Sequence, residues 1–193
     1  MNITDFTGVK TDSPFPYVAN SEGLTVHFGD RARVIETIDL REGDYFQGTI
    51  VIVLPTTYPF GKRTWSERWM TIYNWKQDEI NTVRIGIMCK RAGNLAIVSN
   101  RGGTAAGFHI LDECPSIPPL GVPFELTMQA YLSSSEAVTK GYLNGQLVLS
   151  SSLPNIDSDT HITSASLGVG GCTGAVNQTA TFLKMQTEWM KRL

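Results

Sequence analysis

The sequence is poor in the features that mark several large classes of protein. Its 193 residues include only three cysteines, and no apolar run approaches the ~20 residues that a membrane-spanning helix needs. Lysine and arginine number 16 against 18 acidic residues, with no basic cluster that would favour nucleic acid or an anionic membrane surface. Long segments with a helical spacing of apolar residues are also missing. We therefore expect neither membrane insertion nor nucleic-acid binding.

The cysteines and the first residues bear on the compartment. Cys89, Cys114 and Cys172 are widely spaced and odd in number, which argues against a disulfide framework and leaves one bridge with a spare thiol open. No cysteine or histidine cluster has the spacing of a structural zinc site. The first ten residues contain no basic segment followed by an apolar one, so no secretory signal is predicted. We expect synthesis in the cytoplasm.

Period-two alternation of apolar and polar residues is the main signal that the sequence does contain. In residues 124–132 the alternation is nearly perfect, with Phe124 and every second residue predicted to face inward. Val51 and Val53 interrupt the polar positions of 46–54, which predicts burial on both sides of that strand. The predicted strands are 24–28, 33–40, 46–54, 68–75, 83–89, 95–99, 124–132, 142–148, 162–169 and 180–190. Such a pattern is typical of an all-β fold with two antiparallel sheets packed as a β-sandwich.

One domain accounts for nearly the whole chain. Sheet-forming segments flank both the Gly102–Gly107 loop and the proline-rich connection from Pro115 to Pro123, so neither is predicted to be a domain boundary. We expect residues 1–19 to form an extended amino-terminal arm and residues 20–193 to form the sandwich domain. Aromatic and proline residues in the arm suit packing on a partner chain.

Three segments carry a family resemblance. Gly23–Gly29 followed by Tyr45–Val53 resembles the opening of concanavalin A-like (laminin-G-like) jelly rolls. Val122–Met128 followed by Gly141–Val148, with an Asn-Gly turn in the second segment, is similar to their signature hairpin. The strand Thr181–Met190 is similar to their closing strand. The resemblance implies a jelly-roll sandwich, in a superfamily of lectins, carbohydrate-binding modules, glucanases, polysaccharide lyases and structural modules of viral particles.

Two regions are candidates for binding a ligand. The segment from Trp65 to Trp75 is rich in aromatic residues, which stack on sugar rings, but the face with Trp69, Tyr73 and Trp75 also suits the core. Trp65 precedes the strand and is the better candidate. The second region is the polar face opposite Phe124, which the resemblance makes a concave sugar-binding surface, although any solvated sheet has the same composition. The predicted ligand-binding residues are Trp65, Arg68, Arg84, Glu125, Gln129, Tyr131, Lys184 and Gln186.

A catalytic site is harder to find. The Glu-x-Asp-x-x-Glu run of the glucanase branch is absent, although Glu125 and Glu188 could meet across strands as a carboxylate pair. Tyr131 with Gln129, Arg84 and Lys184 would suit a lyase chemically, but the Gln-x-His element of the lyases is missing. We therefore assign no catalytic residues.

Metal ligands are equally sparse. Asp157 with Asp159, and Asp112 with Glu113, offer oxygen ligands for calcium, but neither pair forms a recognisable calcium loop. We expect no cofactor and no resident metal, with calcium as the alternative.

These observations favour a non-catalytic module that binds a polysaccharide or cell-surface glycan. We expect its setting to be a bacteriophage virion, as a capsid-decoration or host-attachment component that forms part of a larger assembly. One alternative is a purely structural virion subunit that contacts other subunits through residues 1–19. Another is a polysaccharide lyase or glycosidase that acts through the concave polar face.

Overall fold

The chain folds as a sandwich of two antiparallel β-sheets of jelly-roll type, as predicted. The computed structural model describes residues 1–27, 31–56, 67–73, 83–89, 94–101, 108–115, 118–154, 161–170 and 178–191. Within these ranges there is no helix, and thus none that is long and apolar enough to cross a membrane.

The described residues form more strands than the alternation predicted, because short edge strands carry little sequence signal. The strands are β1 (Asn2–Ile3), β2 (Val18–Asn20), β3 (Gly23–His27), β4 (Arg31–Leu40), β5 (Tyr45–Val53), β6 (Glu67–Tyr73), β7 (Val83–Cys89), β8 (Leu95–Arg101), β9 (Phe108–Glu113), β10 (Pro123–Leu132), β11 (Glu136–Leu143), β12 (Gln146–Pro154), β13 (Ile162–Gly170) and β14 (Thr179–Met190).

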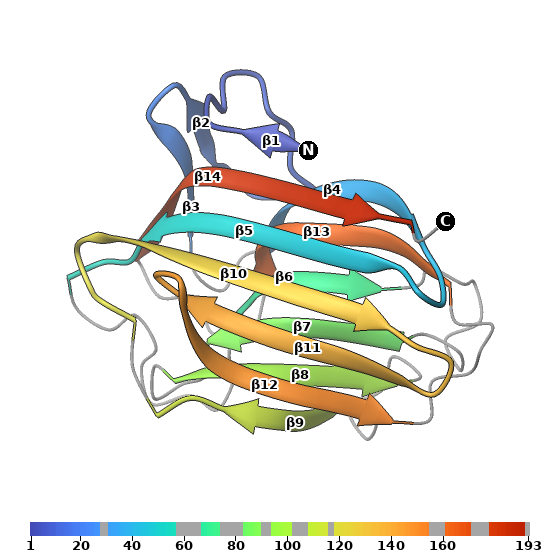
Figure 1. The fold of residues 1–193 in the computed structure, drawn as a ribbon. Coiled ribbons are helices and arrows are strands. Elements are labelled where there is room, and N and C mark those ends of the chain that lie inside the picture. Colours follow the sequence, from blue (N-terminus) through green and yellow to red (C-terminus); the bar gives the residue numbers. More distant parts are fainter. Residues whose placement is uncertain are drawn as a thin grey trace.

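The strands divide into two stacked layers, which Figure 1 shows. The eight-stranded sheet has the order β12-β11-β10-β5-β14-β3-β2, and β1 pairs with β14. The six-stranded sheet has the order β4-β13-β6-β7-β8-β9. Half of the neighbouring pairs among the described strands are distant in sequence, because the chain crosses repeatedly between the layers. Some strands that follow one another, such as β5 and β6, therefore lie in different sheets.

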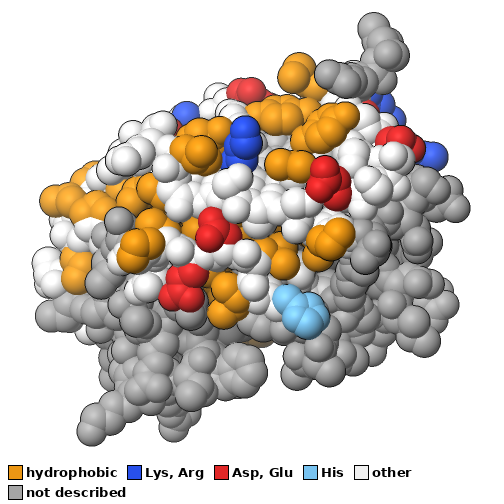
Figure 2. Space-filling model, turned by 60° about the horizontal axis from the view of Figure 1, so that its bottom comes forward, with side chains coloured by type: hydrophobic (Ala, Val, Ile, Leu, Met, Phe, Trp, Pro, Cys, Tyr) orange, Lys and Arg blue, Asp and Glu red, His pale blue; other side chains and the backbone are white. Residues whose placement is uncertain are grey.

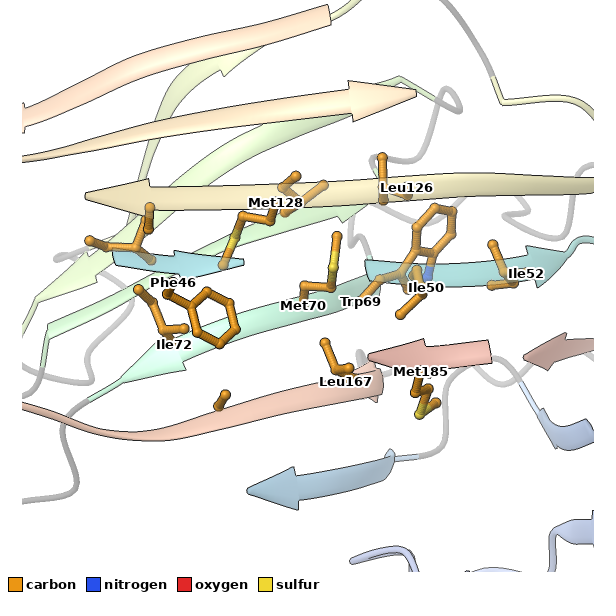
Figure 3. Close-up of a cluster of buried hydrophobic side chains, with 14 of the residues drawn as sticks. Phe46, Ile50, Ile52, Trp69, Met70, Ile72, Leu126, Met128, Leu167 and Met185 are labelled. Atoms are coloured by element: carbon orange, nitrogen blue, oxygen red, sulfur yellow. The ribbon is translucent and has the colours of Figure 1, made fainter. Parts of the chain in front are cut away.

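Apolar side chains from the facing sides of both sheets form one continuous core. Ile50 and Leu126 from the eight-stranded sheet meet Met70 and Trp69 from the six-stranded sheet (Figure 3), and all four are at most 1% exposed. The Cys114 thiol is free and also buried in this core. The side chains of the other two cysteines lie outside the described residues.

Strand β5 lies at the centre of the eight-stranded sheet, between β10 and β14. Its inward positions are buried from Phe46 to Ile52, and β10 alternates in the same way from Phe124 onward, as predicted. The prediction that β5 is buried on both sides is wrong. Val51 and Val53 are half-buried, because they lie on the outer face of the sheet and not between the two layers.

A β-bulge in β6 changes the orientation of Trp69. The register of β6 on β7 shifts between Arg68 and Met70, so Trp69 points into the core next to Met70. Strict alternation placed Trp69 on one face with Thr71 and Tyr73, which is wrong for this reason. Thr71 and Tyr73 occupy the opposite face of the six-stranded sheet. Trp75 lies outside the described residues.

The Asn-Gly hairpin is confirmed. Asn144 and Gly145 have φ angles of 50° and 78° and connect β11 to β12, which is the geometry of a type I′ turn. The Asn144 side chain accepts a hydrogen bond from the backbone N–H of Glu125 at 2.8 Å. This bond ties the turn to the neighbouring strand β10.

The segment 1–19, which we expected to be an arm, contributes to the domain itself. β1 pairs with β14 in the eight-stranded sheet, and Phe6 is fully buried in the core. The Met1 amino group lies 3.0 Å from a Glu36 carboxylate oxygen, and the same carboxylate accepts a hydrogen bond from the Thr187 hydroxyl. These contacts join β14 to β4 and so link the two sheets at this edge.

Candidate functional site

The outer face of the eight-stranded sheet carries a continuous surface of polar side chains from β5, β10, β11 and β14. We call it the polar face. Most of its side chains are half-buried, because neighbours on adjacent strands pack against one another. It consists of Tyr45, Gln47, Thr49, Glu125, Thr127, Gln129, Tyr131, Lys140, Tyr142, Lys184, Gln186 and Glu188.

The register of the strands arranges these side chains in transverse rows. One row runs from Glu188 through Gln47 and Gln129 to Lys140, each residue being the Cα partner of the next. Three strand spacings separate its ends, or about 14 Å. The row therefore places two neutral amides between an acidic and a basic residue.

Gln47 is the centre of a hydrogen-bonded cluster in this row. Its Oε1 accepts one hydrogen bond from the Tyr45 hydroxyl at 3.1 Å and another from Gln129 Nε2 at 2.9 Å. A carbonyl oxygen has two lone pairs, so both are used. The amide of Gln47 is consequently held in one orientation.

The neighbouring rows are also joined by side-chain hydrogen bonds. Thr49 and Thr127 are Cα partners, and their hydroxyl oxygens lie 3.0 Å apart. Gln186 Nε2 donates a hydrogen bond to a Glu188 carboxylate oxygen at 2.5 Å. Such pairs fix side chains that would otherwise lose conformational entropy when a ligand binds.

Tyr45 has an altered acidity. Burial raises the pKa of its phenol above the usual 10.0, and the neighbouring Tyr142 phenol raises it further. A hydrogen bond with Gln129 opposes this shift, while the Glu188 carboxylate adds to it. Tyr45 is therefore a neutral hydroxyl donor throughout the physiological pH range. It does not have the depressed pKa that a phenolate base would need.

Charge is dispersed over the part of the surface that the structure describes. Figure 2 shows acidic and basic side chains standing singly among hydrophobic and uncharged polar ones on the side that it displays. On the polar face, Lys140 lies on a different strand from Glu188, and Lys184 lies four residues before Glu188 on β14. This distribution gives no broad electrostatic attraction for a polyanion.

The structure brings together five of the eight predicted ligand-binding residues. Three of them are on β10 and two are on β14, all on the polar face, and β5 lies between them. They are Glu125, Gln129, Tyr131, Lys184 and Gln186.

The sequence analysis missed the contribution of β5, which is at the centre of the face. Tyr45, Gln47 and Thr49 are polar at alternate positions, opposite Phe46 and Ile50. That alternation was a usable signal. It was hidden because Val51 and Val53 continue the outward positions and make the strand look apolar on both sides.

Arg68 and Arg84 lie in the other sheet. Arg68 is on β6 as the Cα partner of Met88, and Arg84 is on β7 between its partners Tyr73 and Asn100. The expected grouping of Arg84 with Gln129 and Tyr131 is therefore wrong, because β7 and β10 belong to different layers. Trp65 lies outside the described residues.

The outer face of the six-stranded sheet is chemically different from the polar face. Its central side chains are buried, with Tyr73 5%, Asn100 7% and Ser166 3% exposed. Met88, Ala96 and Val98 form a small apolar cluster there.

The carboxylates that could have formed a glycosidase pair are far apart. Glu125 pairs with Val51 and Glu188 pairs with Gln47, so two strand spacings and four residues along β5 separate them. This corresponds to about 16 Å between their Cα atoms, whereas glycosidase carboxyl groups are ~5–9.5 Å apart. Lys184 and Tyr131 are separated by two strand spacings and six residues along β5, or about 22 Å between their Cα atoms. Neither catalytic alternative finds its residues assembled.

The candidate calcium ligands have other partners. Asp112 accepts hydrogen bonds from the backbone N–H groups of Ser150 and Glu113, and Glu113 accepts one from Asn94. The segment with Asp157 and Asp159 lies outside the described residues. In the described part of the chain, no group of three or more histidine, cysteine, aspartate and glutamate side chains could hold a metal ion.

A charged cluster surrounds Asp39 at the edge of the six-stranded sheet. His161 Nε2 lies 2.5 Å from its carboxylate, Lys191 pairs with the other oxygen, and Arg41 lies at 3.5 Å. The hydrogen bond from Lys191 is the largest of the effects that lower the pKa of Asp39 to about 2, with smaller contributions from His161 and Arg41. The cluster joins β4 to the ends of two other strand segments.

Comparison with known proteins gives structural relatives but no sequence family. No family model matches the chain, and no curated protein is significantly similar. An endo-β-1,4-glucuronan lyase from the fungus Trichoderma reesei is similar with a TM-score of 0.62 and 13% identity, over 97% of this chain and 94% of that one.

Two further structures are binding domains. The carbohydrate-binding module CBM66 from Bacillus subtilis has a TM-score of 0.52 and 13% identity, over 90% of this chain and 91% of that one. The carbohydrate recognition domain of Emp46p has a TM-score of 0.56 and 9% identity, over 92% and 86%. At these identities the comparisons show the fold alone, a jelly-roll sandwich shared by carbohydrate-binding modules and polysaccharide lyases.

Proposed function

We propose that this protein is a non-catalytic glycan-binding module and that the polar face binds a polysaccharide chain. The observation that carries the proposal is the hydrogen-bonded cluster of Tyr45, Gln47 and Gln129 at the centre of that face. Fixed amides and hydroxyls can bind sugar hydroxyls, and partly exposed phenols offer apolar surface to sugar C–H groups. Structural neighbours that bind carbohydrate support the same reading.

The proposal excludes catalysis for geometric reasons. The acidic residues of the polar face are too far apart to act together on one glycosidic bond. The arginine that a lyase would use to neutralise a uronate is on β7, in the other sheet. The raised pKa of Tyr45 also makes it a hydroxyl donor and not a base.

Binding to a panel of polysaccharides tests the proposal, with the same samples assayed for new reducing or unsaturated ends. We expect binding without product, and a loss of at least tenfold in affinity for Gln129→Ala and for Tyr131→Ala. His109→Ala, at an exposed position of β9 in the other sheet, is the matched control and should bind normally. Product formation would contradict a non-catalytic role.

Two further variants locate the site if the first ones fail. Arg84→Ala probes the six-stranded sheet and Trp65→Ala probes the aromatic segment. If either variant abolishes binding while Gln129→Ala and Tyr131→Ala bind normally, the polar face is not the site. If no polysaccharide on the panel binds, the proposed function is wrong.

We propose that the protein is a decoration or host-attachment component of a virus particle. In this setting it would attach the particle to such a glycan. The observation that favours a subunit contact is the exposure of Phe15 (49%) and Val18 (57%), next to the edge of the eight-stranded sheet. Labelling of virus particles with an antibody against the protein tests this setting. If the Phe15→Ser, Val18→Ser variant binds glycan but is no longer detected on the particles, a separate subunit contact at these two residues is supported.

A further inference from the structure

The Gln47 amide presents a defined hydrogen-bonding group to a ligand. Its Oε1 is occupied by Tyr45 and Gln129, so its Nε2 is directed away from both and carries two N–H donors. Among the described residues this nitrogen donates to no partner. Tyr45 and Gln129 thus act on the ligand partly through Gln47, because they hold its amide with the Nε2 group free to donate.

Gln129 presents the complementary group on the adjacent strand. Its Nε2 is directed to Gln47, which leaves its Oε1 as an acceptor. Gln47 and Gln129 are Cα partners on β5 and β10, so their side chains stand about 5 Å apart on one face. A donor and an acceptor are therefore presented side by side.

We propose that these two amides bind a pair of adjacent ring hydroxyl groups and that the Glu188 carboxylate beside Gln47 selects a neutral glycan over a polyuronate. The inference rests on the proposed function and defines its ligand class. A hydroxyl both donates and accepts, so a hydroxyl pair satisfies both amides. A polyuronate keeps its ring hydroxyls, so the amides alone do not distinguish it, and the selection depends on the charge beside them.

Two residues of opposite charge flank the amides in their row. Glu188 is the Cα partner of Gln47 and is exposed. Its carboxylate already raises the pKa of Tyr45, so its field reaches the cluster and would repel an anionic ligand lying over Gln47. Lys140 lies at the opposite end of the row, next to Gln129 and two strands from Gln47.

Matched pairs of neutral and acidic polysaccharides test this selection with the full chain. A β-1,4-glucan and its C6-oxidised glucuronan differ only at C6, and β-1,4-mannan with mannuronan extends the comparison. We expect at least one neutral polymer to bind, at least tenfold more tightly than its uronate. Tighter binding of a uronate would overturn the inference and leave the proposed function standing. Failure of all polymers to bind would overturn both.

Gln47→Glu isolates the role of the donor. The substituted side chain still accepts from Tyr45 and Gln129 but replaces the N–H donors with an oxygen, so affinity should fall at least tenfold. Below about pH 4 the introduced carboxyl becomes protonated and regains one O–H donor, so binding should partly recover. Gln146→Glu makes the same chemical change at an exposed position on β12 and should bind as the unmodified protein does. Unchanged affinity of Gln47→Glu would overturn the assignment.

Tyr45→Phe tests the positioning role of the phenol. Removing the hydroxyl frees one lone pair of Gln47 Oε1, so the amide is held by Gln129 alone. We expect a several-fold loss in affinity for the neutral glycan and a smaller preference over the uronate, with an unchanged thermal midpoint. A loss in affinity with the preference retained would show that Tyr45 contacts the ligand directly and does not orient Gln47.

Discussion

Trp69 and Phe124 contact each other across the sandwich, with ring centroids 6.1 Å apart and planes tilted by 46°. Trp69 belongs to β6 of the six-stranded sheet and Phe124 to β10 of the eight-stranded sheet. Strand β10 also carries Gln129 and Tyr131 on its other side. The contact between Trp69 and Phe124 therefore packs against the core side of the strand that holds part of the polar face.

Replacing Trp69 should mainly change stability. Trp69→Ala leaves a large cavity in the core, so we expect the free energy of unfolding in urea to fall by about 3–5 kcal/mol. Tyr142→Ala, on the polar face, should cost less than about 1 kcal/mol. Equal losses for the two variants would contradict the placement of Trp69.

Two glycines with positive φ angles should respond differently to alanine. Gly168 has a φ of +126°, and a Cβ there would lie 2.4 Å from the carbonyl oxygen of Ala32 on the neighbouring strand β4. Backbone strain of about 1–3 kcal/mol and the displacement of β4 should add, so we expect Gly168→Ala to cost about 3 kcal/mol or more. Gly8, with a φ of +76° and open space around it, should lose only about 1–2 kcal/mol. Urea unfolding of both variants measures the difference.

Acid should weaken the fold through Asp39. Its folded-state pKa is lowered from 3.8 to about 2, first by the hydrogen bond from Lys191, so the unfolded chain takes up the proton before the folded one. The stabilisation is present above about pH 4 and is lost as the pH falls toward 2. Thermal unfolding between pH 2 and 6 should show this slope, and Asp39→Asn should reduce it. An identical pH profile for Asp39→Asn would contradict the assignment.

Alkaline pH should lower the stability of the fold through Tyr45. Because its pKa is raised in the folded protein, the unfolded chain loses this proton first, and stability falls as the pH rises above about 10. Absorbance titration of the phenols should show one group ionising late, and Tyr45→Phe should remove it. Glu188→Gln should lower the pKa of Tyr45 toward its usual value, since it removes a neighbouring negative charge.

The sequence was sufficient to predict a strand where one of its faces is buried and the other is exposed to solvent. The in-and-out pattern of β10 and the type I′ turn at Asn144 follow from such local signals. The orientation of Trp69 did not, because an inserted residue at the β6 bulge reverses the alternation and leaves no mark in the composition.

The grouping of the site residues depended on information that is not local. Arg84 and Glu125 are both polar positions in segments of alternating sequence, but sheet membership is set by pairings between distant segments. The same limit hid Gln47, whose significance comes from its position between β10 and β14 and not from its sequence neighbours.

The position of β5 also has a consequence for how the chain folds during synthesis. β5 comprises Tyr45–Val53, yet its two partners are β10 and β14, which begin at Pro123 and Thr179. On the ribosome, β5 therefore emerges long before either edge can be covered, and its second edge waits for one of the last segments to be synthesised. Pairings this distant are slow to form, so we expect completion of the eight-stranded sheet to limit the folding rate. The strand that supplies the centre of the polar face would then be among the last to reach its native surroundings.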